Sequence, residues 1–182
     1  MTITELKIRV YGDPVLRKKS KLVKEVGPGE RMLVAAMIEA MHHNKGIGLA
    51  APQVGINEQI LVADIGDGPL AIINPRILKK SGREVLEEGC LSLPGVNVEV
   101  RRAKKIFVSF INESGRKVQK TFEGLLARVI LHETDHLHGK LIIDYVSFAQ
   151  RIKLRPVLKA IRAHIYSQTD NDNSPVKTAP MV

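Results

Sequence analysis

The 182-residue sequence has one cysteine, Cys90, no tryptophan, and only 4% aromatic residues. A single cysteine cannot form an intramolecular disulfide, so the class of small secreted domains built on disulfides is excluded. Aromatic side chains that could stack on single-stranded nucleic acid are also scarce. We therefore expect Cys90 either to fill space in the core or to take part in chemistry.

Long hydrophobic runs are missing as well. The longest apolar stretches, such as residues 125–131 with Arg128 among them, are far shorter than the roughly 20 residues of a bilayer-spanning helix. The first ten residues mix charged and apolar side chains and have no uninterrupted apolar centre, unlike a signal peptide. We expect a cytoplasmic protein without a membrane partner.

Positive charge is in excess, because 28 Lys and Arg residues outnumber 19 Asp and Glu residues and give a formal net charge of +9. Such a charge favours association with a polyanion such as nucleic acid, but it does not predict a fold or sequence-specific recognition. Residues 151–164 are basic without a single acid; the basic side chains are Arg151, Lys153, Arg155, Lys159 and Arg162. An ordinary solvated helix face explains this pattern equally well.

The pattern of apolar and turn residues predicts one domain over residues 1–166, without repeats or an internal linker. A loop is expected over 16–26, followed by a helix over 32–41. Short β-branched runs bounded by Gly, Pro, Asn and Ser then predict strands at 59–62, 71–74, 96–100, 106–111 and 117–122. Residues 112–115 are typical of a hairpin turn.

Helical spacing returns over residues 125–137 and ends near Gly139. A strand-like segment at 141–143 and a last helix over 147–164 follow, the helix interrupted or offset by Pro156. Residues 167–182 are polar and predict a disordered tail. The expected class is α+β, with antiparallel β-sheets packed around the helix at 125–137, and with an N-terminal and a C-terminal helix.

The strongest chemical signal is the run His132-Glu133-Thr134-Asp135-His136. Two histidines four residues apart lie one turn apart along a helix and only ~40° apart around it, so both rings can reach one metal ion. Glu133 is near enough to reach a water bound to that ion, as in H-E-x-x-H metal sites. An exposed helix with two incidental histidines is the alternative, but two polar rings on a buried helix would be costly without partners.

A catalytic metal site generally has three protein ligands and one open position, so a third ligand is needed. His138 and His164 are the nearest downstream candidates, and their spacing suits neither of them. Cys90 is the better candidate, because Gly89 before it predicts a turn that allows close backbone approach. A bound metal would also hold the thiol as a thiolate.

A third segment, residues 46–53, combines two glycines and two alanines with Gln53. Small residues permit close backbone approach, and the Gln53 amide can donate to a developing oxyanion. Alone, such a segment is typical of a turn packed against a strand.

Together these three segments resemble the motifs of peptide deformylase, which read G-hydrophobic-G-hydrophobic-A-A-x-Q, E-G-C-hydrophobic-S and H-E-hydrophobic-D-H in this order. The resemblance covers about residues 8–150 and is to the compact bacterial form with a C-terminal helix. Thr134 departs from the hydrophobic position of the third motif, and Leu131 stands where Gln is frequent. Neither position is expected to bind the metal.

The resemblance implies that Cys90, His132 and His136 bind one Fe²⁺ ion per chain, for which Zn²⁺ or Ni²⁺ can substitute. It implies removal of the formyl group from N-formylmethionine at the N-terminus of nascent polypeptides, with release of formate. A metal-bound water would attack the formyl carbon, with Glu133 as the general acid-base. Gln53 and the backbone N–H of Leu91 would stabilise the oxyanion.

In this family the peptide binds as an added strand, so the main chain of Ile47, Gly48 and Gly89 is expected to bind substrate. Leu125 and Val129 are expected to line the methionine pocket. Similar C-terminal helices in bacterial deformylases dock on the ribosome, which makes the ribosome an expected partner.

Two other functions remain open at this point. One is an H-E-x-x-H metallopeptidase that cuts internal peptide bonds, which the third ligand and the substrate entrance would distinguish. The other is a basic RNA-binding protein with a structural zinc, for which a closed four-ligand site and aromatic stacking platforms are expected.

Overall fold

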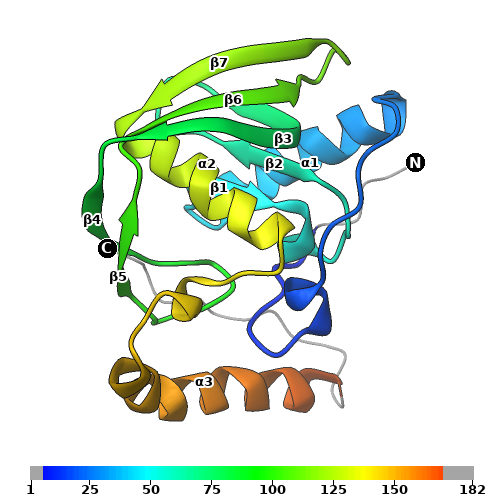
Figure 1. Cartoon of the computed structure of the whole chain (residues 1–182). Coiled ribbons are helices and arrows are strands. Elements are labelled where there is room, and N and C mark those ends of the chain that lie inside the picture. The colour runs from blue at the N-terminus through cyan, green and yellow to red at the C-terminus, as the bar shows by residue number, and fades with distance from the viewer. Residues whose placement is uncertain (1–5, 170–182) are drawn as a thin grey trace.

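The computed structural model describes the backbone of residues 6–169 and the side chains of residues 6–163 (Figure 1). It has three α-helices, which are α1 (Pro28–His43), α2 (Gly124–Leu137) and α3 (Phe148–Thr169). The strands are β1 (Gly48–Ala50), β2 (Ile60–Ala63), β3 (Leu70–Ser81), β4 (Glu84–Glu88), β5 (Val98–Arg102), β6 (Lys105–Ile111) and β7 (Lys117–Glu123). Three short 3₁₀ turns are η1 (Pro14–Arg17), η2 (Ala51–Val54) and η3 (Ile142–Asp144).

The strands form two antiparallel sheets, one of five strands in the order β1-β2-β3-β6-β7 and one of the two strands β4 and β5. The predicted hairpin joins β6 to β7, where the Asn112 side chain accepts hydrogen bonds from the backbone N–H groups of Ser114 and Arg116. The predicted α+β class with antiparallel sheets is confirmed.

A helix packs on each face of the larger sheet. Alternate strand residues point to opposite faces, so Ile60 and Val62 join the core that contains α1, while Leu61 joins the core that contains α2. All four residues of β2 are buried, because both of its faces are covered. Figure 1 shows α2, in yellow, running across the sheet between β1 and the two-stranded sheet. The helix with the histidines is therefore central.

A third core cluster joins α3 to the smaller sheet. Leu158 and Ile161 on α3 pack with Val98 and Val100 of β5, and Cys90 lies in the same cluster. The helix continues through Pro156, which the sequence predicted as an interruption or offset. It extends to Thr169, and the rest of the predicted tail, residues 170–182, lies outside the described residues.

Two details of the predicted elements were wrong. The segment 141–143 is not a strand but leads into the turn η3, because the Leu141 N–H donates to the Asp144 side chain and the Asp144 N–H donates to the Leu141 carbonyl. Strands β1 and β4 were not predicted at all. The expected loop holds over residues 18–26, where Lys21 forms one isolated parallel bridge with Glu58.

Of the helices described for residues 6–169, none combines the length and apolar character that crossing a bilayer requires.

Candidate metal centre

His132 and His136 present their rings on the same side of α2. Their Nε2 atoms lie 3.3 Å apart, and their ring centroids are 5.1 Å apart. His136 is 1% exposed. This is the arrangement expected of two histidines four residues apart, and it puts both imidazole nitrogens within reach of one ion.

Cys90 completes the group from a different segment, the turn that follows β4. Its Sγ atom lies 3.3 Å from Nε2 of His136, and the ligand atoms of Cys90, His132 and His136 all lie within 4.8 Å of one another. His138 instead contacts the backbone carbonyl of Thr134 through Nδ1 at 2.7 Å. The side chain of His164 lies outside the described residues. The structure thus groups the cysteine, and not His138, with the two histidines.

The donor set fits a divalent transition metal. One thiolate and two imidazoles are ligands that such ions accept, and three protein ligands leave a fourth position open. Nδ1 of His132 lies 3.0 Å from Oε2 of Glu88, so the carboxylate favours a proton on Nδ1 and a free lone pair on Nε2. Nδ1 of His136 is buried and has no hydrogen-bond partner in the described part of the chain.

The two histidines differ in their electrostatic surroundings. Burial lowers the pKa of His136 well below its ordinary value, and the neighbouring His132 lowers it further. Burial also lowers the pKa of His132, but hydrogen bonds to Cys90 and Glu88 outweigh this effect and raise it. A cation that binds at Nε2 of His132 would displace the second ring proton, which the raised pKa favours, and would leave the proton on Nδ1.

Glu133 is 4% exposed and lies against β1. Burial raises the pKa of its carboxyl to about 7, although His132 and Arg102 lower it in part. Its Oε2 atom has no hydrogen-bond partner among the described residues. A β-carbon at Gly48 would lie 2.5 Å from Oε1 of Glu133, so the glycine leaves the space that this carboxylate occupies.

Gln53 lies in the turn η2 and is buried beside Cys90. Its Oε1 atom accepts a hydrogen bond from the Ala50 N–H at 2.7 Å, which orients the amide. Its Nε2 atom is then 3.6 Å from Sγ of Cys90 and 3.3 Å from Oγ of Ser92. Leu91 directly follows Cys90 in the turn closed by the Leu93 N–H and the Cys90 carbonyl. Two potential N–H donors therefore lie next to the predicted metal ligands.

The same chain matches a known protein family. The family model of polypeptide deformylase matches residues 5–151. The chain belongs to the peptide deformylase family. The resemblance predicted from the three motifs is confirmed, and with it a metal-dependent enzyme of the deformylase type rather than an endopeptidase or a structural-zinc RNA-binding protein.

Individual relatives agree. The peptide deformylase of Thermotoga maritima is 50% identical over 156 residues, which cover 85% of this chain and 95% of the relative. Its crystal structure superposes with a TM-score of 0.77 over 79% of this chain and 99% of that one. A plant peptide deformylase structure, 34% identical, gives a TM-score of 0.86 over 93% of this chain and 96% of the other. The structure of the Synechococcus elongatus deformylase with actinonin is 41% identical, with a TM-score of 0.80 over 87% of each chain.

The residues predicted to bind the substrate differ in their exposure. Ile47 and Leu125 are 45% and 50% exposed, while Val129 is buried against Gly48. The carbonyl of Ile47 already accepts from the Asp64 N–H. β1 is the outermost strand of the larger sheet, so within the described residues its other edge has no strand partner.

A buried charged network lies beside His132, and most of it was not predicted from the sequence. Both oxygens of Glu88 accept from Arg102, at 2.6 and 2.9 Å, and Oε1 also accepts from Arg128 at 2.7 Å. Burial raises the pKa of Glu88, but hydrogen bonds with His132 and Arg102 outweigh it and lower the pKa to about 2. Nothing in the local sequence pattern indicated Arg102.

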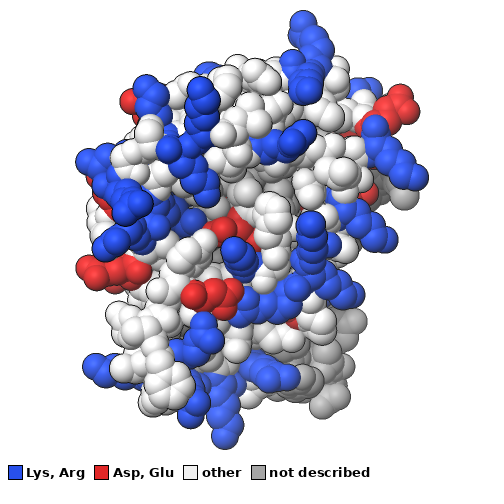
Figure 2. All heavy atoms as spheres, in the orientation of Figure 1, with Lys and Arg blue, Asp and Glu red and all other residues white. Residues whose placement is uncertain are grey.

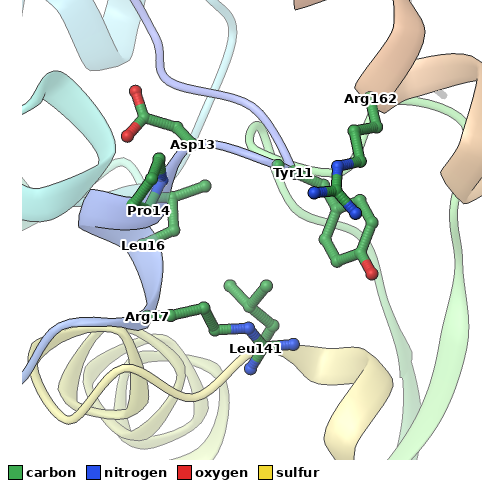
Figure 3. A pocket seen from close by; sticks show the side chains of 8 residues that line it. Tyr11, Asp13, Pro14, Leu16, Arg17, Leu141 and Arg162 are labelled. Atoms are coloured by element: carbon green, nitrogen blue, oxygen red, sulfur yellow. The ribbon is translucent and has the colours of Figure 1, made fainter.

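A separate cavity of about 190 Å³ lies where the N-terminal segment, η1 and α3 meet (Figure 3). Its lining comprises Tyr11, Gly12, Asp13, Pro14, Leu16, Arg17, Leu141 and Arg162. None of the predicted site residues lines it.

Proposed function

We propose that Cys90, His132 and His136 hold one Fe²⁺ ion, and that the enzyme removes the formyl group from N-formylmethionine at the N-terminus of nascent polypeptides. The observation that carries this proposal is the approach of one thiol and two imidazole nitrogens to within 4.8 Å of one another, in a chain of the deformylase family. Iron follows from the family resemblance, since the donor set also accepts Zn²⁺ or Ni²⁺.

Glu133 is the general acid-base of the reaction. A divalent ion at this site supplies a Lewis acid that lowers the pKa of a water molecule. Glu133 takes the proton of the attacking water and returns it to the departing amine, so formate and a free N-terminus result. A pKa of about 7, raised by burial, suits a group that must both accept and donate a proton near neutral pH.

Gln53 and Leu91 stabilise the charge that develops on the formyl oxygen. The Nε2 donor of Gln53 is held beside Cys90 by the hydrogen bond between its Oε1 and the Ala50 N–H. The backbone N–H of Leu91, the residue after Cys90, is the second donor. Donors fixed before the reaction need no reorganisation, and this is why such groups are effective.

The substrate peptide lies extended along the free edge of β1. Main-chain groups of Ile47, Gly48 and Gly89 bind its backbone as an added strand would be bound, which needs no particular peptide sequence. The methionine side chain enters an apolar pocket to which Leu125 and Val129 contribute, one exposed at its rim and the other buried.

The basic helix α3 is the proposed contact with the ribosome. The proposed location is the cytoplasm, where formylated nascent chains are made. Figure 2 shows Lys and Arg side chains over the lower part of the molecule, where Figure 1 places α3. Deletion of residues 147–182 should abolish co-sedimentation with ribosomes, and unchanged co-sedimentation would remove this partner from the proposal.

Formate release from a formyl-Met peptide tests the function. The iron-loaded protein, protected from oxygen, should release formate, whereas Glu133→Ala should bind metal and release almost none. No formate from the parent protein, or equal rates from both proteins, would contradict the mechanism.

A further inference from the structure

The three predicted metal ligands come from two segments that are far apart in the sequence. Cys90 follows β4, while His132 and His136 lie on α2. A side chain that contacts both segments would therefore influence the separation of the three ligand atoms. Arg102, on β5, is such a side chain.

The side chain of Arg102 is 5% exposed, and its guanidinium donates hydrogen bonds in two directions. Toward β4, Nε and Nη2 donate to the two oxygens of Glu88 at 2.6 and 2.9 Å. Toward α2, Nη1 donates to Oδ2 of Asp135 at 2.8 Å. Glu88 lies two residues before Cys90 and also contacts His132, and Asp135 directly precedes His136. The arginine thus bridges the carboxylates next to all three ligands.

Tyr145 holds the other side of this bridge. It stands between η3 and α3, and its hydroxyl donates to the same Oδ2 of Asp135 at 2.8 Å. The Cζ atom of Arg102 lies 5.3 Å from the centre of its ring, within the range of a cation–π contact. Asp135 therefore receives two donors on one oxygen, and the guanidinium is confined between a ring and two carboxylates.

We propose that Arg102 and Tyr145 are positioning residues of the metal centre, which keep the Cys90 turn and α2 at the separation that the three ligands require. This inference rests on the proposed role of Cys90, His132 and His136 as ligands. Neither residue touches the metal or the substrate in this proposal. Their effect is on metal affinity and on the geometry of the thiolate–metal bond, because outer partners orient the ligands.

Cobalt binding in the absence of substrate tests the proposal. Co²⁺ affinity is measured by competition with a chelator, and the thiolate-to-cobalt absorption band reports the geometry. Tyr145→Phe removes a single oxygen and keeps the ring, and Arg102→Met removes the bridge. Each should raise the Co²⁺ dissociation constant by about 10- to 100-fold and shift the absorption band.

Two control variants accompany them. Tyr11→Phe removes the hydroxyl of a residue that lines the separate cavity; this hydroxyl makes no hydrogen bond to Glu88, Arg102 or Asp135 among the described residues, and its loss should leave cobalt binding unchanged. Arg128→Met removes another arginine bonded to Glu88, but Arg128 has no contact with Asp135 among the described hydrogen bonds and should change the affinity less than Arg102→Met.

Parental cobalt affinity and spectrum in both Tyr145→Phe and Arg102→Met would overturn the proposal, even if their melting temperatures fall. If Arg102→Met does not fold, the conservative Tyr145→Phe variant decides. A parent protein that shows no thiolate-to-cobalt band would contradict the proposed ligand set itself, which separates that failure from failure of the positioning role.

Discussion

The carboxylate of Glu133 occupies the space that a side chain at Gly48 would need. A β-carbon there would lie 2.5 Å from Oε1 of Glu133 and 2.6 Å from Cγ1 of Val129. Both atoms belong to residues of α2, and the orientation of this helix about its axis also determines where the two histidine rings lie. Gly48 of the first motif is thus coupled sterically to Glu133, the proposed acid-base residue in the third motif.

Gly48→Ala should therefore displace the Glu133 carboxylate and reduce formate release by about 10²-fold, because a shift of about 1 Å in a catalytic group has such an effect. Metal content should stay near that of the parent. Gly29→Ala is the control, since a β-carbon at that helical position meets nothing within 4 Å. Equal rates for both variants would argue against a catalytic role for Glu133 at this position.

Cys90→Ala should lose its metal, because the proposed site falls from three protein ligands to two. The metal content after gel filtration measures this directly. His138→Ala is the matched control, because His138 contacts the Thr134 carbonyl instead of the ligand group and its loss should leave the metal in place. Full retention of metal by Cys90→Ala would reject the cysteine as a ligand.

Gln53→Glu should reduce the rate of formate release by about 10²- to 10³-fold with unchanged metal content. The substitution keeps an oxygen to accept from the Ala50 N–H but replaces the Nε2 donor with a negatively charged oxygen. Gln59→Glu is the control, because it changes another buried glutamine, one that donates to the Ser20 carbonyl. The folded Gln59→Glu variant should release formate at the same rate as the parent. A Gln53 variant as fast as the parent would exclude an oxyanion role.

Gly139→Ala should destabilise the fold more than another glycine replacement of the same backbone type. Gly139 has φ of +70°, and a β-carbon would lie 2.6 Å from the backbone oxygen of Arg17. Gly95 has φ of +73° with nothing within 4 Å, so Gly95→Ala adds only the strain of about 1–3 kcal/mol expected for that conformation. Urea denaturation should rank the variants in this order, and equal losses would contradict the contact between Gly139 and Arg17.

The ion pair of Asp144 with Arg17 predicts a dependence of stability on pH. Burial raises the pKa of the Asp144 carboxyl, but Arg17 and the Leu141 N–H outweigh it and lower the pKa below its ordinary value of 3.8. A lowered folded-state pKa means that this contribution is complete above about pH 4 and is lost as the pH falls through the folded-state pKa.

Asp144→Asn should accordingly be less stable than the parent at pH 7, and the difference in free energy of unfolding should shrink as the pH falls below about 4. Denaturant titrations of both proteins at several pH values measure it. A difference that stays constant from pH 7 to pH 2 would show that the charge of Asp144 is not its source.

The helices and strands that were predicted well are those whose apolar residues follow a regular local spacing or form a β-branched run. The helices at α1 and α2 follow from apolar spacing, and β6 and β7 from β-branched runs around a turn. By contrast, β1 has three residues including Gly48, too few for a pattern. β4 is rich in glutamate, and its strand conformation depends on pairing with β5.

The contacts between buried charged residues could not be predicted from local sequence patterns either, because they depend on how separate segments pack. In the register of β4 and β5, Arg102 stands opposite Glu84, yet its guanidinium contacts Glu88, four residues further along β4. Neither strand pairing nor sequence spacing predicts that contact. Only the packing of β4, β5 and α2 against one another shows which carboxylate neutralises which arginine.

By itself the sequence determined the chemistry that is local: two histidines and a glutamate at helical spacing, an apolar helix that must be buried, and the three motifs of the deformylase family. The tertiary structure decided the rest. It brought Cys90 to within 3.3 Å of a histidine 46 residues away, and it joined the two segments through Arg102. Helical spacing is a property of adjacent residues, whereas a contact between distant segments exists only when the whole core packs around them.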